Sequence, residues 1–371
     1  MPQHVFWSYR ESACALLQGN TPAHALTNTD FWTLAQADAM FPLLWSSLSP
    51  EQQEIAKPWL LNPMDEHIFA TEALRMRNMT ARVLRAYQQA GIPIICMRGL
   101  AISETLYPKP YLRPHTDIDI LFDKQHLLWA KQVAGNDLHF RPIQAYPMLF
   151  KLGDIPLDLH IEPIGAERIQ AWKHLTPLHT QDFFKYAYKS ELAGEEALLV
   201  HPRVMLPYLC FHALKHSFER LIWLYDIALL AEQVESHGLW GEVLQGISEY
   251  KLERPCFYAL SYVKTHMNAP VADEYLQYIK PKMDIIEARL FKRFMQHEVI
   301  PYMAERLFSR MLPSFKHRLS FWKETIYPRP EVRAQIAGGG CVKCNFIRTR
   351  IKQVARAAWS LGKETARMIR I

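Results

Sequence analysis

The stretch DIDILF at residues 117–122 decides the expected fold, because it places two carboxylates on one face of a β-strand and two isoleucines on the other. Aspartate is depleted in strands, so Asp117 and Asp119 at a spacing of two need an explanation. A bound divalent cation supplies one, since Mg²⁺ prefers carboxylate oxygens. A strand end whose aspartates face solvent or cap a turn supplies another. The first interpretation predicts a metal-dependent phosphoryl or nucleotidyl transfer enzyme.

The segments around this strand alternate between helical and extended patterns. In chain order they are a long helix at 64–90, a strand at 92–97, a short helix at 99–107, a helix at 124–135 and a hairpin of strands at 146–152 and 155–161. Gly91 is expected to end the long helix, and a Gly153-Asp154 turn to join the hairpin. This order predicts a small mixed sheet with helices on one side.

Helical patterns flank this sheet in the sequence. Short apolar segments precede residue 62, and helical stretches run from residue 202 to about 325. The expected fold class is therefore α+β, with a small mixed β-sheet core embedded in N- and C-terminal helical regions. The expected divisions are an N-terminal helical region at 1–90, an α/β core at 91–200, a C-terminal helical domain at 201–335 and a basic amphipathic tail at 336–371.

Positive charge is concentrated at the C-terminal end. The net charge is +6 over 371 residues, and residues 341–371 hold eight Lys or Arg against Glu364, so the rest is close to neutral. This tail can bind an anionic membrane surface, RNA or an acidic partner, or pack its apolar stripe on the body. No apolar stretch reaches transmembrane length, signal-peptide features are missing, and six dispersed cysteines fit reduced thiols, so a cytoplasmic protein is expected.

Three groups of chemically useful residues converge if the sheet assignment is right. At the turn after the first strand, Gly99 lets the backbone approach a phosphate and Arg98 adds a cation. Asp117 and Asp119 on one strand and Asp158 on another can hold two Mg²⁺ ions ~3.5 to 4 Å apart. One ion would activate an attacking hydroxyl, and the other would steady a triphosphate.

Several motifs occur in a characteristic order. They are MRGL at 97–100, LYP at 106–108, LRP at 112–114, DID at 117–119, DLH at 158–160, FHALKH at 211–216, LIWLYDIA at 221–228 and YPRP at 327–330. Together they resemble the uncharacterised bacterial nucleotidyltransferase family of the DNA polymerase beta superfamily, over roughly residues 30–335. The resemblance implies a nucleotidyltransferase core within the α+β fold and a metal triad at Asp117, Asp119 and Asp158.

The resemblance also implies a reaction. A nucleoside monophosphate would move from a nucleoside triphosphate to an acceptor, with release of pyrophosphate. The acceptor would be a small molecule, a peptide or a saccharide, and nucleic acid is less favoured. Arg98 stands where the family usually has lysine, and Leu100 where the wider superfamily commonly has serine. These departures support an alternative, a non-catalytic nucleotide-binding or regulatory module with the same fold.

Two residues beside the acidic strands allow two roles each. Arg113 can reach the triphosphate, or it can pair with Asp117 or Asp119. His160 shares the strand face of Asp158 and can contact nucleotide or acceptor, or donate a hydrogen bond to a metal-binding carboxylate.

A second cationic group lies at helical spacing further along the chain. His212, Lys215 and His216 share one helical face and can contact a phosphate tail, or they can be packed histidines beside a solvated lysine. Asp226 stands within an apolar helix, so it is expected to pair with a base such as Lys215 or Arg220.

Overall fold

The computed structural model describes residues 3–61, 66–144, 146–165, 169–327 and 332. The expected basic tail at 336–371 lies outside this part of the chain. Within it, none of the helices combines the length and the apolar character needed to cross a bilayer. The cysteines in the described ranges are buried and unpaired, as expected: Cys14, Cys96, Cys210 and Cys256.

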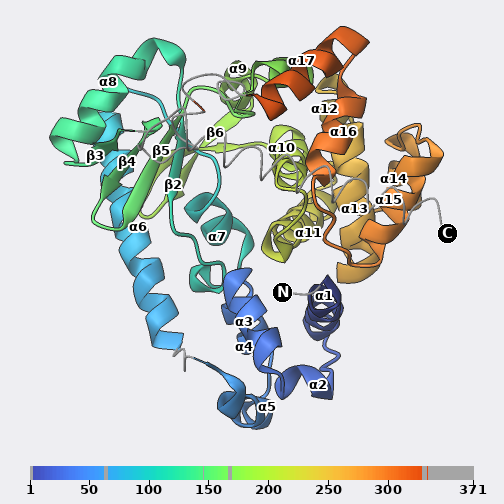
Figure 1. Cartoon of the computed structure of the whole chain (residues 1–371). Coiled ribbons are helices and arrows are strands. Elements are labelled where there is room, and N and C mark those ends of the chain that lie inside the picture. Colours follow the sequence, from blue (N-terminus) through green and yellow to red (C-terminus); the bar gives the residue numbers. More distant parts are fainter. Residues whose placement is uncertain (1–2, 62–65, 145, 166–168, 328–331, 333–371) are drawn as a thin grey trace.

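A mixed sheet of seven described strands has the order β3-β4-β5-β2-β1-β7-β6 (Figure 1). The strands are β1 Ile95–Cys96, β2 Ile118–Leu121, β3 Arg141–Ile143, β4 Tyr146–Leu152, β5 Ile155–His160, β6 Ala187–Leu192 and β7 Glu195–Val200. Strand β2 runs parallel to β5 and antiparallel to β1, and β1 runs parallel to β7. The expected α+β class is confirmed.

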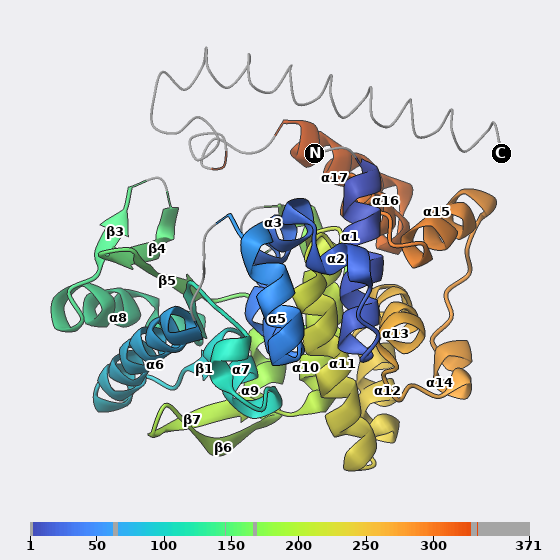
Figure 2. The ribbon, with the colours of Figure 1, turned by 90° about the horizontal axis from the view of Figure 1, so that it is seen from below.

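Helices precede, interrupt and follow the sheet. The described α-helices are α1 Gln3–Leu17, α2 Ala23–Leu26, α3 Thr29–Ala37, α4 Phe41–Ser46, α5 Pro50–Ala56, α6 Glu66–Gln89, α7 Leu100–Leu106, α8 Leu127–Gln132, α9 Thr180–Lys185, α10 Pro202–Lys215, α11 Leu221–Ser236, α12 Trp240–Glu249, α13 Glu253–Met267, α14 Asp273–Tyr278, α15 Ile285–Met295, α16 Met303–Met311 and α17 Phe315–Ile326. In a second view, α10 and α11 lie between the sheet and the later helices (Figure 2).

The two faces of the sheet belong to different cores. Ile118 and Ile120 of β2 and Leu157 of β5 pack in a core with side chains of α6 and α8. Leu121 lies in the other core, which includes α10 and α11. Burying each aliphatic side chain stabilises the fold by roughly 1.5–3 kcal/mol, so a one-residue slip of the register would be costly. The alternation therefore fixes Asp119 on the α10 side of the sheet.

Local patterns predicted several elements correctly. The long helix is confirmed as α6, and Gly91 follows it with φ 68°. The hairpin is confirmed as β4 and β5. The expected strand at 92–97 was too long. The strand is Ile95–Cys96, with one further hydrogen bond from the Met97 amide to the Asp119 carbonyl oxygen, and Pro93 has no amide hydrogen to donate.

Other elements differ from the expectation. The hairpin of β6 and β7 was not predicted. Its turn, Ala193-Gly194, has φ values of 56° and 82°. Alanine rarely adopts a positive φ, so the sequence Ala-Gly is a weak indication of such a turn. The helical pattern expected from residue 202 onward is interrupted between α10, which ends at Lys215, and α11, which begins at Leu221. Ser217 and Phe218 hold φ values of 55° and 52°, which no helix continues.

Candidate functional site

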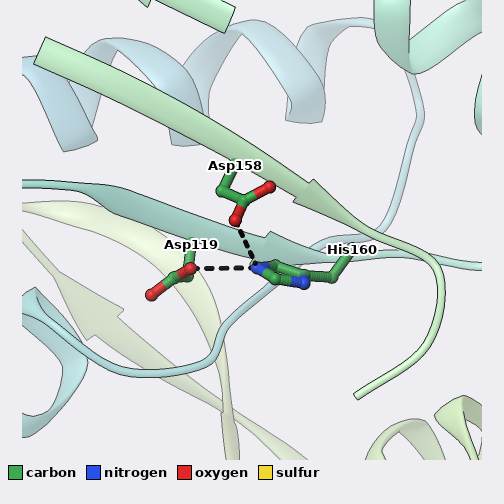
Figure 3. A group of neighbouring side chains, drawn as sticks. All are labelled: Asp119, Asp158 and His160. Atoms are coloured by element: carbon green, nitrogen blue, oxygen red, sulfur yellow. Dashed lines mark hydrogen bonds and ion pairs between the residues drawn. The ribbon is translucent and has the colours of Figure 1, made fainter. Parts of the chain in front are cut away.

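Neighbouring strands bring two of the expected carboxylates together. In the parallel pair of β2 and β5, Asp119 is the direct register partner of Asp158, and Leu121 is the partner of His160. Asp158 and His160 are two residues apart and therefore share one face of β5. Figure 3 shows the imidazole of His160 reaching toward both carboxylates. We call Asp119, Asp158 and His160 the Asp–Asp–His cluster.

Distances within the Asp–Asp–His cluster are short. His160 Nε2 lies 2.9 Å from Asp119 Oδ1 and 3.4 Å from Asp158 Oδ2. One ligand atom from each residue lies within 4.8 Å of the others. Two carboxylates and an imidazole are donors that suit a divalent cation, so the side chains present fit a metal site.

Asp117 lies outside the Asp–Asp–His cluster. It comes immediately before β2 and is exposed as a whole residue, whereas the Asp119 side chain is 6% exposed. Of the three expected metal residues, the structure therefore brings Asp119 and Asp158 together with His160, and places Asp117 beside them at the strand entry.

Arg98 forms an ion pair with the buried carboxylate of the cluster. Its Nη2 lies 2.9 Å from Asp119 Oδ1, and its Nη1 lies 2.5 Å from Nδ1 of His212. Burial, and next the Arg98 charge, lowers the pKa of His212, so its neutral ring accepts this hydrogen bond. Arg98, which was expected to contact the phosphates, is thus paired with the Asp119 carboxylate in this structure. For His212, the alternative of a packed histidine applies.

The three aspartates have different proton affinities. Burial alone would raise the pKa of Asp119, but the Arg98 charge and the His160 hydrogen bond outweigh it and hold this pKa below its usual range. Desolvation raises the pKa of Asp117, and the charge of Asp119 raises it further. Desolvation also raises the pKa of Asp158. Asp119 is therefore the fixed negative charge, and the other two carboxylates hold protons more readily.

Gly99 occupies a backbone conformation that side chains avoid. Its φ is 56° and its ψ is −114° where α7 begins. A Cβ there would lie 3.4 Å from the His115 ring and 3.5 Å from the carbonyl oxygen of Asp117. Glycine is thus required by the torsion angles, and its backbone lies close to Asp117, the residue immediately before β2.

Arg113 pairs with Asp226, so two expectations need correction. Arg113 Nη2 lies 2.7 Å from Asp226 Oδ2, and the Tyr107 hydroxyl donates to Asp226 Oδ1 at 2.7 Å. Arg113 therefore does not pair with Asp117 or Asp119, and Asp226 does not take Lys215 or Arg220. The partners are far apart in sequence, and spacing within one helix gives no sign of such a contact.

All the expected site residues line one cavity of about 1050 Å³: Arg98, Gly99, Arg113, Asp117, Asp119, Asp158, His160 and Lys215. Lys215 Nζ lies 5.1 Å from the centre of the Trp172 ring. Phe69, Tyr146 and Met148 form part of another wall. The cavity is therefore lined by a cationic side chain, Lys215, by the acidic side chains of the Asp–Asp–His cluster, and by an apolar wall of Phe69, Tyr146 and Met148.

Two tryptophans lie beside basic residues of the cavity: Trp172 beside Lys215, and Trp223 beside Arg220. The Trp223 ring lies 5.2 Å from the His212 ring and 5.0 Å from that of His216. Both side chains also pack against the larger core, so the sequence alone does not distinguish them from core tryptophans.

Comparison with known proteins gives a family and a distant structural likeness. A model of the family described as uncharacterised nucleotidyltransferase matches residues 25–268. No curated protein matches the chain. The solution structure of the antibiotic-resistance factor ANT(2'')-Ia is 14% identical, with a TM-score of 0.33, over 52% of this chain and 99% of that one.

Proposed function

This chain belongs to the uncharacterised nucleotidyltransferase family, and on that premise we propose that it transfers a nucleoside monophosphate from a nucleoside triphosphate to an acceptor hydroxyl. The observation that supports this most is the pairing of Asp119 with Asp158 on adjacent parallel strands, inside a cavity large enough for a nucleotide and a small acceptor. Such chemistry depends mainly on positioning and on neutralising phosphate charge.

In this proposal Asp119 and Asp158 would hold a divalent cation such as Mg²⁺, and Asp117 would complete a two-ion site. A bound divalent cation would neutralise phosphate charge and lower the pKa of a coordinated hydroxyl. The acceptor oxygen forms a bond to the α-phosphorus as the bond to pyrophosphate breaks. Asp158, whose pKa is raised, accepts the hydroxyl proton.

The phosphates lie along the cationic side of the cavity. Lys215 provides a point charge there, and the backbone at Gly99 allows close approach. Arg98 stays within reach of the triphosphate from its position on Asp119, and Arg113 lies at the cavity wall while paired with Asp226. His160 orients the carboxylates through the hydrogen bond to Asp119.

The apolar wall leads us to propose a small-molecule, peptide or saccharide acceptor with an apolar portion. Phe69, Tyr146 and Met148 offer contact surface rather than phosphate-binding charge. A nucleic-acid acceptor is less favoured, because outside the tail the chain is close to neutral. A cytoplasmic setting fits these substrates.

The test follows radioactive label from a mixed pool of α-labelled nucleoside triphosphates to candidate acceptors, with Mg²⁺. Asp119→Asn and Asp158→Asn should each slow transfer by about a hundredfold or more while keeping the circular dichroism spectrum of the parent. Asp137→Asn, an exposed aspartate outside the cavity, is the matched control and should transfer at the parental rate. Parental rates in both site variants would refute the proposal.

A second candidate is a nucleotide-binding module without turnover. The ion pair between Arg98 and Asp119 favours it, since a carboxylate already bonded to arginine is a weaker cation ligand. Calorimetry with Mg²⁺ and each nucleoside triphosphate, followed by a pyrophosphate-release assay, separates the two. Binding with no release under any acceptor supports the module.

A further inference from the structure

We infer that His160 Nε2 is a metal ligand, so that the Asp–Asp–His cluster binds later first-row transition-metal dications such as Co²⁺ and Ni²⁺ in preference to Mg²⁺. The inference rests on the cation site of the proposed function and specifies which cation class the site selects. In the metal-bound state the Nε2 lone pair would contact the ion, so this contact would replace the hydrogen bond from Nε2 to Asp119.

The strand geometry presents the imidazole to the same point as the carboxylates. His160 is the last residue of β5, and its side chain is 21% exposed. It stands two residues after Asp158 on the same strand face, opposite Leu121 of β2. Figure 3 shows the ring directed between the two carboxylates rather than away from them.

The distances suit a shared cation without rearrangement. Ligand atoms at about 2.1 Å from an octahedral cation lie about 3.0 Å apart when they are neighbours in the coordination sphere. The separations of Nε2 from Asp119 Oδ1 and Asp158 Oδ2 are 2.9 Å and 3.4 Å. Asp117 is not part of this group, so the third ligand atom close to the two carboxylates is the nitrogen of His160 rather than an oxygen.

Nitrogen in this position changes the preferred cation. Imidazole suits Co²⁺, Ni²⁺ and later first-row ions better than Mg²⁺, which takes oxygen ligands and keeps several waters. Arg98 strengthens the preference, because its charge on Asp119 weakens purely electrostatic binding of any cation. The bond to a neutral imidazole depends less on that charge.

The experiment is calorimetric titration of the full chain with CoCl₂, NiCl₂ and MgCl₂, without nucleotide. The parent should bind Co²⁺ more tightly than Mg²⁺. His160→Asn keeps a side chain that can donate to Asp119, and it should lose about tenfold or more in Co²⁺ affinity with Mg²⁺ affinity changed less than about threefold. His237→Asn, an exposed histidine outside the cavity, is the matched control and should bind as the parent.

A second variant and an absorption spectrum distinguish the loss of a metal ligand from a loss of the fold. His160→Asp makes the group all-oxygen, so the ratio of Co²⁺ to Mg²⁺ affinity should fall while Mg²⁺ binding is kept. The visible absorption of the Co²⁺-loaded chain should change in both His160 variants and not in His237→Asn. Unchanged Co²⁺ affinity in the variants, an equal loss for both metals, or a parental preference for Mg²⁺ would each overturn the inference. Because no nucleotide is present, these results are independent of the transfer assay for Asp119 and Asp158.

Discussion

The buried ion pair of Arg113 and Asp226 fixes the loop that leads into β2. Arg113 is 7% exposed and Asp226 is 2% exposed. The carboxylate accepts from Arg113 Nη2 and the Tyr107 hydroxyl at 2.7 Å each, and from Arg113 Nε at 3.1 Å. We predict that Asp226→Asn lowers the free energy of unfolding by about 3–5 kcal/mol, because it leaves the arginine charge buried without a counter-charge.

The assay is urea unfolding followed by intrinsic tryptophan fluorescence, with midpoint and slope compared between variants. The double variant Arg113→Met with Asp226→Leu should lose much less than the sum of the single changes, since no unpaired charge remains. Glu196→Gln, which breaks the exposed 3.0 Å pair with Lys189, is the control and should change stability by less than about 1 kcal/mol. A loss below about 1 kcal/mol for Asp226→Asn, or additive losses in the double variant, would refute the reasoning.

Three further predictions concern packing, backbone and pH. Gly246→Ala should destabilise the fold by about 3 kcal/mol in thermal unfolding, because its Cβ would lie 2.2 Å from the Arg203 carbonyl oxygen, whereas Gly241→Ala in the same helix meets nothing within 4 Å and should be neutral or stabilising. Gly99→Ala should cost about 1–3 kcal/mol by the same measurement through its backbone torsion alone, and an unchanged melting temperature would contradict this. Burial and a neighbouring histidine lower the pKa of His297 to about 4, so its unfolded form gains a proton first and stability should fall as the pH drops from 6.5 to 4. His297→Asn should reduce that fall by about 1–2 kcal/mol, allowing for partial exposure, and urea midpoints that fall equally steeply in variant and parent would count against it.

Local sequence signals predicted the elements whose contacts are close in the chain. The alternation at residues 117–122 and the hairpin through Gly153 depend on neighbouring residues, and both are confirmed. Strand β7 pairs with β1, about a hundred residues earlier, and its sequence EEALLV shows little alternation. Long-range pairing of this kind is set by the assembled core. The divisions at 1–90, 91–200, 201–335 and 336–371 stay a prediction, although all described strands lie between residues 95 and 200.

In the candidate site too, some contacts could be predicted from the sequence and others could not. The meeting of Asp119 and Asp158 follows from two strands with matching patterns, so the sequence could anticipate it. The partner of Arg113 could not be anticipated, because the contact joins a loop to α11 across more than a hundred residues. The roles of these side chains in catalysis stay predictions until variants are measured.

The two departures from the family pattern have physical consequences in this chain. An arginine fork contacts Asp119 with one nitrogen and His212 with the other, which the single ammonium of a lysine cannot do in the same geometry. Leu100 is 3% exposed and packs inward, so the hydroxyl that a serine would offer is replaced by core packing. In the proposed reaction, the cation and the triphosphate would therefore bind with Arg98 already paired with Asp119. Either Arg98 moves from Asp119 to the phosphates when substrate arrives, or it stays and reduces the charge that the carboxylates present. The second case makes a nitrogen ligand such as His160 more important to cation binding, since its bond does not depend on that charge.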